Sequence, residues 1–133
     1  MAMALSEREN SESAWEDLVV SILAVNQYSL ERIFPLLDRL RGQQLTNPFV
    51  LVCEDVDNID SRLRASGFDR GAFMTRLFAQ RLASLGSLIR AKGVSEFELI
   101  LKGSNKTAIK ELLLPVKGIG PVVLRNFFIL RAI

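Results

Sequence analysis

The feature that most limits the fold of this chain is its apolar pattern, which follows helical spacing almost from end to end. Large apolar residues recur three and four positions apart, as in Leu30, Ile33, Leu37 and Leu40, and this spacing places them on one face of an α-helix. Residues 47–56 (NPFVLVCEDV) alone could pass for a strand, but a lone strand has no partner. The sequence therefore predicts an all-α, compact multi-helix domain of about seven short helices.

Capping signals and glycines predict where these helices begin and end. Two pairs have the spacing of a capping box and predict helix starts: Ser13 with Glu16, and Ser95 with Glu98. Asn47 followed by Pro48 predicts the start of a short helix. We expect the other helices at about residues 30–42, 57–66, 72–93, 109–116 and 122–133.

Length and residue usage exclude several classes of protein. The chain has 133 residues, 49% of them hydrophobic, which suits one domain; we expect an N-terminal tail at 1–12 and a helical domain at 13–133. No apolar run approaches membrane-spanning length, so we expect no membrane contact and a cytoplasmic location, at the nucleoid in a bacterium or archaeon. Cys53 is the single cysteine and there is no histidine, which excludes an internal disulfide, an iron–sulfur cluster and His-ligated metals.

Charge is distributed unevenly along the chain. Residues 1–60 hold four Lys or Arg against eleven Asp or Glu, which gives −7, and residues 61–133 hold thirteen against four, which gives +9. Such asymmetry indicates a polyanion-binding face in the later half. Ordinary charged helix faces would give the same pattern, and charge alone does not separate the two interpretations.

The run Lys117-Gly118-Ile119-Gly120-Pro121 predicts a tight turn between two helices, a helix-hairpin-helix. Backbone N–H groups at the start of the second helix have no intrahelical acceptor and lie at the positive end of its dipole, an arrangement that binds phosphate. The nucleic-acid contacts predicted here are Lys117, Gly118, Ile119, Gly120, Val122, Val123 and Arg125, with Arg70, Lys110, Arg76, Arg81 and Lys106 as candidates for a phosphate track. The alternative is a plain corner between helices.

This hairpin resembles that of the helix-hairpin-helix DNA glycosylase superfamily, the endonuclease-III-like base-excision repair enzymes. Residues 18–40 and 59–85 resemble family segments in the same order, and the resemblance covers about Trp15 to Leu130. It implies the family's helical-barrel domain and a hairpin that grips the backbone of double-stranded DNA, damaged DNA included. It also implies a monovalent cation, Na⁺ or K⁺, held by hairpin carbonyls.

The sequence departs from the family at the catalytic positions. Lyase-active members carry a Lys two residues after the second hairpin glycine, where this chain has Val122, and an aliphatic side chain cannot form a Schiff base. The segment with the family's catalytic Asp and its four-cysteine cluster would follow Ile133. We therefore predict no catalytic residue, and leave open whether the chain is one half of a glycosylase completed by another chain, a second copy or a missing C-terminal segment. Such a partner would pack on the last helix.

Two further groups have a functional and a structural interpretation. Asn26, Gln27 and Tyr28 lie where the family faces the opened base, and they could equally cap or fill the loop. The acidic run Glu54, Asp55, Asp57 and Asp60 could bind a metal, but its spacing matches no known site and favours helix capping. A third possibility for the whole domain is protein binding, with the hairpin as scaffold.

Overall fold

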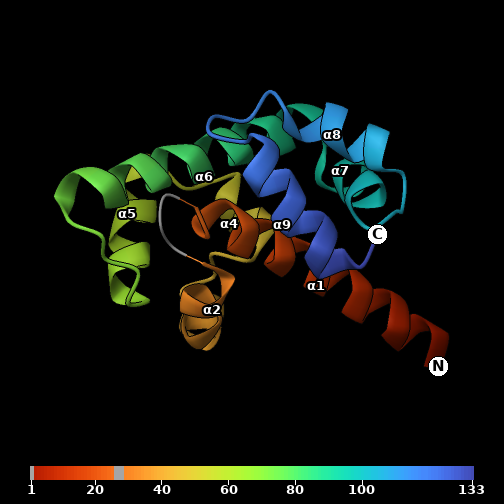
Figure 1. Ribbon diagram of the computed structural model, residues 1–133, viewed down its shortest axis with the longest axis horizontal. Coiled ribbons are helices and arrows are strands. Elements are labelled where there is room, and N and C mark those ends of the chain that lie inside the picture. The colour runs from red at the N-terminus through yellow and green to blue at the C-terminus, as the bar shows by residue number, and fades with distance from the viewer. Residues whose placement is uncertain (1, 26–28) are drawn as a thin grey trace.

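Figure 1 shows the computed structural model, which describes the backbone of residues 2–25 and 29–133 and the side chains from Glu12 onward, Asn26, Gln27 and Tyr28 excepted. Within these residues the chain forms helices and turns and no strand, which confirms the predicted all-α class. The elements are α1 (Ala2–Leu23), α2 (Leu30–Ile33), the 3₁₀ helix η1 (Phe34–Leu36), α3 (Leu37–Gly42), α4 (Pro48–Leu51), α5 (Val56–Ala65), α6 (Ala72–Lys92), α7 (Val94–Leu101), α8 (Lys106–Leu113) and α9 (Pro121–Arg131).

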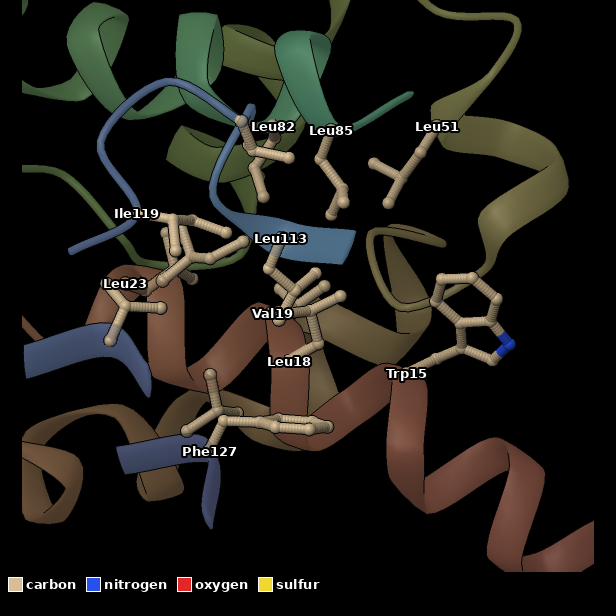
Figure 2. Packing of buried hydrophobic residues seen from close by; sticks show 14 of the residues in the cluster. Trp15, Leu18, Val19, Leu23, Leu51, Leu82, Leu85, Leu113, Ile119 and Phe127 are labelled. Atoms are coloured by element: carbon tan, nitrogen blue, oxygen red, sulfur yellow. The ribbon is translucent and has the colours of Figure 1, made fainter. Parts of the chain in front are cut away.

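The core is built around the second half of α1. Residues 18–23 of this helix and the two residues after it are all buried, so the helix is covered on every side here, by α6, α7 and α9 among others. Figure 2 shows Leu18 and Val19 of α1 in one cluster with Leu113 of α8 and Phe127 of α9. A helix that is apolar on all faces is a central helix rather than a surface one.

Helix α9 runs alongside α1 although the two are far apart in sequence (Figure 1). The Arg131 guanidinium donates to Ser13 Oγ at 3.0 Å and pairs with the Asp17 carboxylate at 3.1 Å. Asn126 Nδ2 donates to the carbonyl of Ala24 at 3.0 Å, close to the end of α1. Polar contacts at both ends of the pair therefore fix α9 in register on α1.

Helix α6 is the longest element after α1 and packs against α4 and α5. Gly86, buried in its interior, allows the close approach of α4. A Cβ atom on Gly86 would overlap the carbonyl oxygen of Leu51 and lie 2.8 Å from its carbonyl carbon. The crossing of α4 over α6 therefore requires glycine at this position.

The two predicted capping boxes are wrong. Helix α1 begins at Ala2 rather than at Ser13, and α7 begins at Val94 with Gly93 as its N-cap. Three of the four side chains of these boxes make tertiary contacts instead. Ser13 accepts from Arg131, Glu16 accepts from Arg41, and Glu98 accepts from the indole nitrogen of Trp15 at 2.7 Å.

The other boundaries follow the sequence closely, with two exceptions. The helix expected at 109–116 is α8, which begins and ends three residues earlier. The structure confirms helices at 57–66 and 72–93 to within a residue or so, and α4 is helical rather than extended. The helix expected at 30–42 is divided into α2, η1 and α3. Pro35 lies in the first turn of η1, and its ring lacks the N–H that a continuous helix would need.

Replacement of Asn47 by alanine should lower the free energy of unfolding by about 1 kcal/mol. The Asn47 Oδ1 atom accepts from the Phe49 backbone N–H at 3.0 Å and caps α4. Chemical denaturation followed by circular dichroism measures the loss. Asn58→Ala is the control, since Asn58 is exposed and its own side chain caps no helix; an equal loss in both variants would show that the cap contributes nothing.

Candidate functional site

The seven residues 114–120 connect α8 to α9 and form a tight turn at the predicted position. Gly118 has φ of +80°, in the left-handed region that glycine adopts without strain. The Ile119 N–H donates to the Val116 carbonyl at 3.2 Å. The Lys117 N–H donates to Ser84 Oγ on α6 at 3.1 Å, which attaches the turn to the helix beneath it.

Two apolar side chains, one in the turn and one at the start of α9, point into the core. Ile119 is buried, in one cluster with Leu23 of α1 and Leu82 of α6 (Figure 2). Val123 is also buried, whereas Val122 is exposed. Of the predicted contacts, Ile119 and Val123 can therefore meet a ligand only through their backbone groups.

A shallow pocket of about 220 Å³ lies at this turn. Its walls are formed by Val25, Arg81, Gly118, Gly120, Pro121, Val122 and Val123. The N–H groups of Val122 and Val123 belong to the first turn of α9 and have no intrahelical acceptor. Gly120 is extended, with φ of −137°, and a Cβ there would meet no atom within 4 Å. The mouth of the pocket is therefore open at Gly120.

Arg81 of α6 is the charged side chain of this pocket. It packs against Gly118, where an added Cβ would lie 2.8 Å from the guanidinium carbon, and it lies over the ring of Phe78 at 4.9 Å from the centroid. Partial burial lowers the pKa of Arg81, but a guanidinium stays charged at neutral pH. Among the described residues, Arg81 has no carboxylate partner, so its charge is available to an external anion.

Arg70 lies close to this pocket but is engaged in holding the fold. Its Nη1 atom donates to the Val25 carbonyl at 3.1 Å, and its guanidinium carbon lies 5.4 Å from the centroid of the Phe78 ring. The Arg70 N–H also donates to Thr75 Oγ1 at 2.8 Å. Arg70 therefore attaches the end of α1 to the start of α6 and adds positive charge beside the pocket.

The remaining predicted basic residues of α6, α8 and α9 do not line this pocket. Arg125 and Lys110, together with Lys106, line a second hollow of about 500 Å³ between α8 and α9. Pro121 contributes to the walls of both hollows. The predicted nucleic-acid contacts thus form two groups, one at the turn and one along the groove. Arg76 belongs to neither, because it pairs with Asp57 at 2.7 Å.

The acidic run of α5 has the structural role that its spacing indicated. Each of its four members caps a helix or pairs with an arginine: Glu54 with Arg62, Asp55 with the Asn58 N–H, Asp57 with Arg76, and Asp60 with Arg64. Within the part of the chain that the structure describes, no group of three or more Cys, Asp or Glu could hold a metal ion. The monovalent cation at the turn stays a prediction.

Val25 and Ser84 were not among the residues singled out from the sequence. Ser84 lies three positions after Arg81, so helical spacing places both on the same face of α6. This spacing is visible in the sequence, but it points to Ser84 only once the turn is known to pack on that face. Val25 lines the pocket immediately before Asn26, Gln27 and Tyr28. The prediction that those three face a base falls outside the described residues.

No helix in the described ranges, 2–25 and 29–133, has the length and apolar character needed to cross a membrane. Comparison of the chain with protein-family models, with curated proteins and with solved structures gives no match. The residues of the turn and its pocket are therefore the basis for a functional proposal.

Proposed function

We propose that the chain binds the phosphate backbone of double-stranded DNA at the turn between α8 and α9, with these elements acting as a helix-hairpin-helix motif. A backbone phosphate would accept from the N–H groups of Val122 and Val123, with Arg81 on one side of it and Lys117 on the other. Contacts of this kind fix the position of a protein on DNA without reading its sequence.

The observation that carries the proposal is the coincidence of three features in one pocket. These are the N–H groups at the start of α9 that have no intrahelical acceptor, an arginine with no carboxylate partner among the described residues, and a glycine at the mouth that leaves the N–H groups accessible. Each feature alone is common in helical proteins. Together they form a concave, positively charged surface lined with donors, which favours a phosphate oxygen.

The proposal is one of binding rather than catalysis. Lyase-active members of the helix-hairpin-helix DNA glycosylase superfamily, which the hairpin resembles, carry their nucleophile at the position of Val122. The Val122 side chain is exposed and aliphatic. Binding through a few phosphate contacts should give a Kd on the order of 10⁻⁴ to 10⁻⁶ M at physiological salt and should weaken as salt is raised. A preference for a duplex with an abasic-site analogue would connect the protein to DNA repair.

Gly120→Val should weaken binding to a short fluorescein-labelled duplex about tenfold, which corresponds to about 1.4 kcal/mol. The valine side chain would stand at the mouth of the pocket and keep a phosphate away from the N–H groups, while the extended backbone and free space around Gly120 leave the fold intact. Fluorescence anisotropy, with intact and abasic duplexes at two salt concentrations, measures the loss. Equal affinity of the variant and the wild type would refute the proposed contact.

Gly42→Val is the matched control, because a Cβ at Gly42 also meets no atom within 4 Å and the residue ends α3, outside the pocket. A second pair tests the charge. Arg81→Gln should reduce the affinity for DNA, and it should reduce the slope of log K against log salt by about one. Lys92→Gln is the control, at the exposed C-terminal end of the same helix. It should reduce both the affinity and the slope less.

A further inference from the structure

The groove between α8 and α9 differs from the pocket at the turn in both size and lining. Its volume of about 500 Å³ is within the range of protein binding sites. Most of its lining is apolar, and includes Leu114, Leu124, Phe128 and Ile129. A phosphate backbone gains nothing from such a floor, so the groove calls for a ligand with apolar side chains of its own.

The apolar floor is open to solvent rather than closed over. Ile129 is 62% exposed and Leu114 is 47% exposed, and both are among the large apolar side chains that the fold leaves uncovered. An exposed Ile or Leu standing alone is ordinary on a protein surface. Here, however, these residues share a concave site with a half-buried phenylalanine, which is the arrangement that anchors partner side chains.

Three cations line the same groove: Lys106, Lys110 and Arg125. Among the described residues none of the three has a carboxylate partner. The ammonium group of Lys106 lies over the Phe128 ring, 5.6 Å from its centroid. Lys106 and Lys110 are four residues apart on α8, where like charges repel, and the first turn of α8 has no acidic residue to offset its dipole. The groove therefore has a surplus of positive charge that an anionic ligand would relieve.

We propose that this groove binds an acidic amphipathic helix of a partner protein. Apolar side chains on one face of that helix would fill the floor at Leu114, Phe128 and Ile129, and Asp or Glu residues on its flanks would pair with the three cations. Helix α8 is about 12 Å long, so the groove accommodates about two turns, with anchors at i, i+3 or i+4, and i+7. This site is independent of phosphate binding at the turn.

A displayed library of random peptides, each long enough for about four helical turns, tests the proposal without assuming a partner. Selection on the wild-type protein should enrich sequences that combine Leu or Phe at helical spacing with Asp and Glu. The enriched peptides, labelled and measured by fluorescence anisotropy, should bind Ile129→Glu and Lys110→Glu each about tenfold more weakly than the wild type, equivalent to about 1.4 kcal/mol. Raising the salt concentration should weaken binding to the wild type more than to Lys110→Glu.

Leu99→Glu is the matched control for Ile129→Glu. Leu99 is 67% exposed on α7 and does not line the groove, so this variant should bind the peptides as the wild type does. Because Ile129, Lys110 and Leu99 are all exposed, each variant should keep the wild-type circular dichroism spectrum. A variant with an altered spectrum is replaced by Ile129→Ser or Lys110→Gln at the same position.

Three results would overturn the proposal. The first is that the enriched peptides lack acidic residues, or that they bind the groove variants as tightly as the wild type. The second is loss of DNA binding in Lys110→Glu without any effect on peptides, which would assign the groove to nucleic acid. The third is a wild-type dimer that Ile129→Glu converts to a monomer in sedimentation, which would assign the groove to a second copy of the chain.

Discussion

Gly86→Ala is expected to lower the free energy of unfolding by about 3 kcal/mol, even though alanine is intrinsically the better helix former by about 1 kcal/mol. The added methyl group would overlap the backbone carbonyl of Leu51. A backbone group cannot rotate away as the end of a long side chain can, so α4 must move off α6 or α6 must bend. Both responses open the contact between the two helices.

Helix propensity alone would make Gly86→Ala more stable than the wild type, whereas the overlap with Leu51 would make it less stable. The sign of the measured change therefore shows which effect is larger. Urea denaturation followed by far-UV circular dichroism gives the free energy of each variant. Gly42→Ala is the control, since Gly42 is also a helical glycine, at the end of α3, and a Cβ there meets no atom within 4 Å; this variant should be neutral or stabilising by up to about 1 kcal/mol. If Gly86→Ala were as stable as the wild type, the close crossing of α4 over α6 would be wrong.

Phe127→Ala should lower the free energy of unfolding further, by about 3–5 kcal/mol. Phe127 is fully buried and lies beside Leu18 of α1 in the central cluster (Figure 2). Its removal leaves a cavity at the contact between α1 and α9, where helices fixed by Arg131 and Asn126 cannot collapse freely to fill it. The loss should therefore include both the transfer of the ring and the cavity.

Phe73→Ala provides the comparison, because the same ring is removed from a position that is 79% exposed on α6. Its effect should stay within about 0.5 kcal/mol. The fluorescence of Trp15, the single tryptophan, provides a second probe, since its indole stacks on Phe97 at 5.4 Å and reports the contact of α1 with α7. Similar losses in the two Phe variants would contradict the placement of α9 on α1.

The class and most of the helices could be predicted because apolar spacing and terminal glycines act locally. Gly67 and Gly93 both adopt positive φ where the sequence placed the ends of α5 and α6. The capping boxes were wrong for the opposite reason. Whether a serine or glutamate accepts from its own helix or from a distant arginine or tryptophan depends on which elements pack beside it, and Ser13 and Glu98 were both taken by tertiary partners.

In the candidate site, too, the features set by local sequence could be predicted and those set by tertiary packing could not. The tight turn at Gly118 follows from its own sequence, since the two glycines and Pro121 act within a few residues. The partners of the turn come from elsewhere in the chain, and Arg81 could be recognised only as one basic residue among many until α6 was placed beneath it. Closeness in sequence likewise grouped Arg125 with the turn, although Arg125 lines the groove between α8 and α9.

The pairing of α1 with α9 has a consequence for biosynthesis. Residues 18–25 are synthesised before the helix that covers one of their faces, 121–131, which follows more than ninety residues later. Until then the face of α1 that α9 covers has no final partner in the nascent chain, and exposed apolar surface of this kind promotes aggregation and chaperone binding. The contact between α1 and α9 should therefore form only after α9 is synthesised, as contacts between distant segments slow folding.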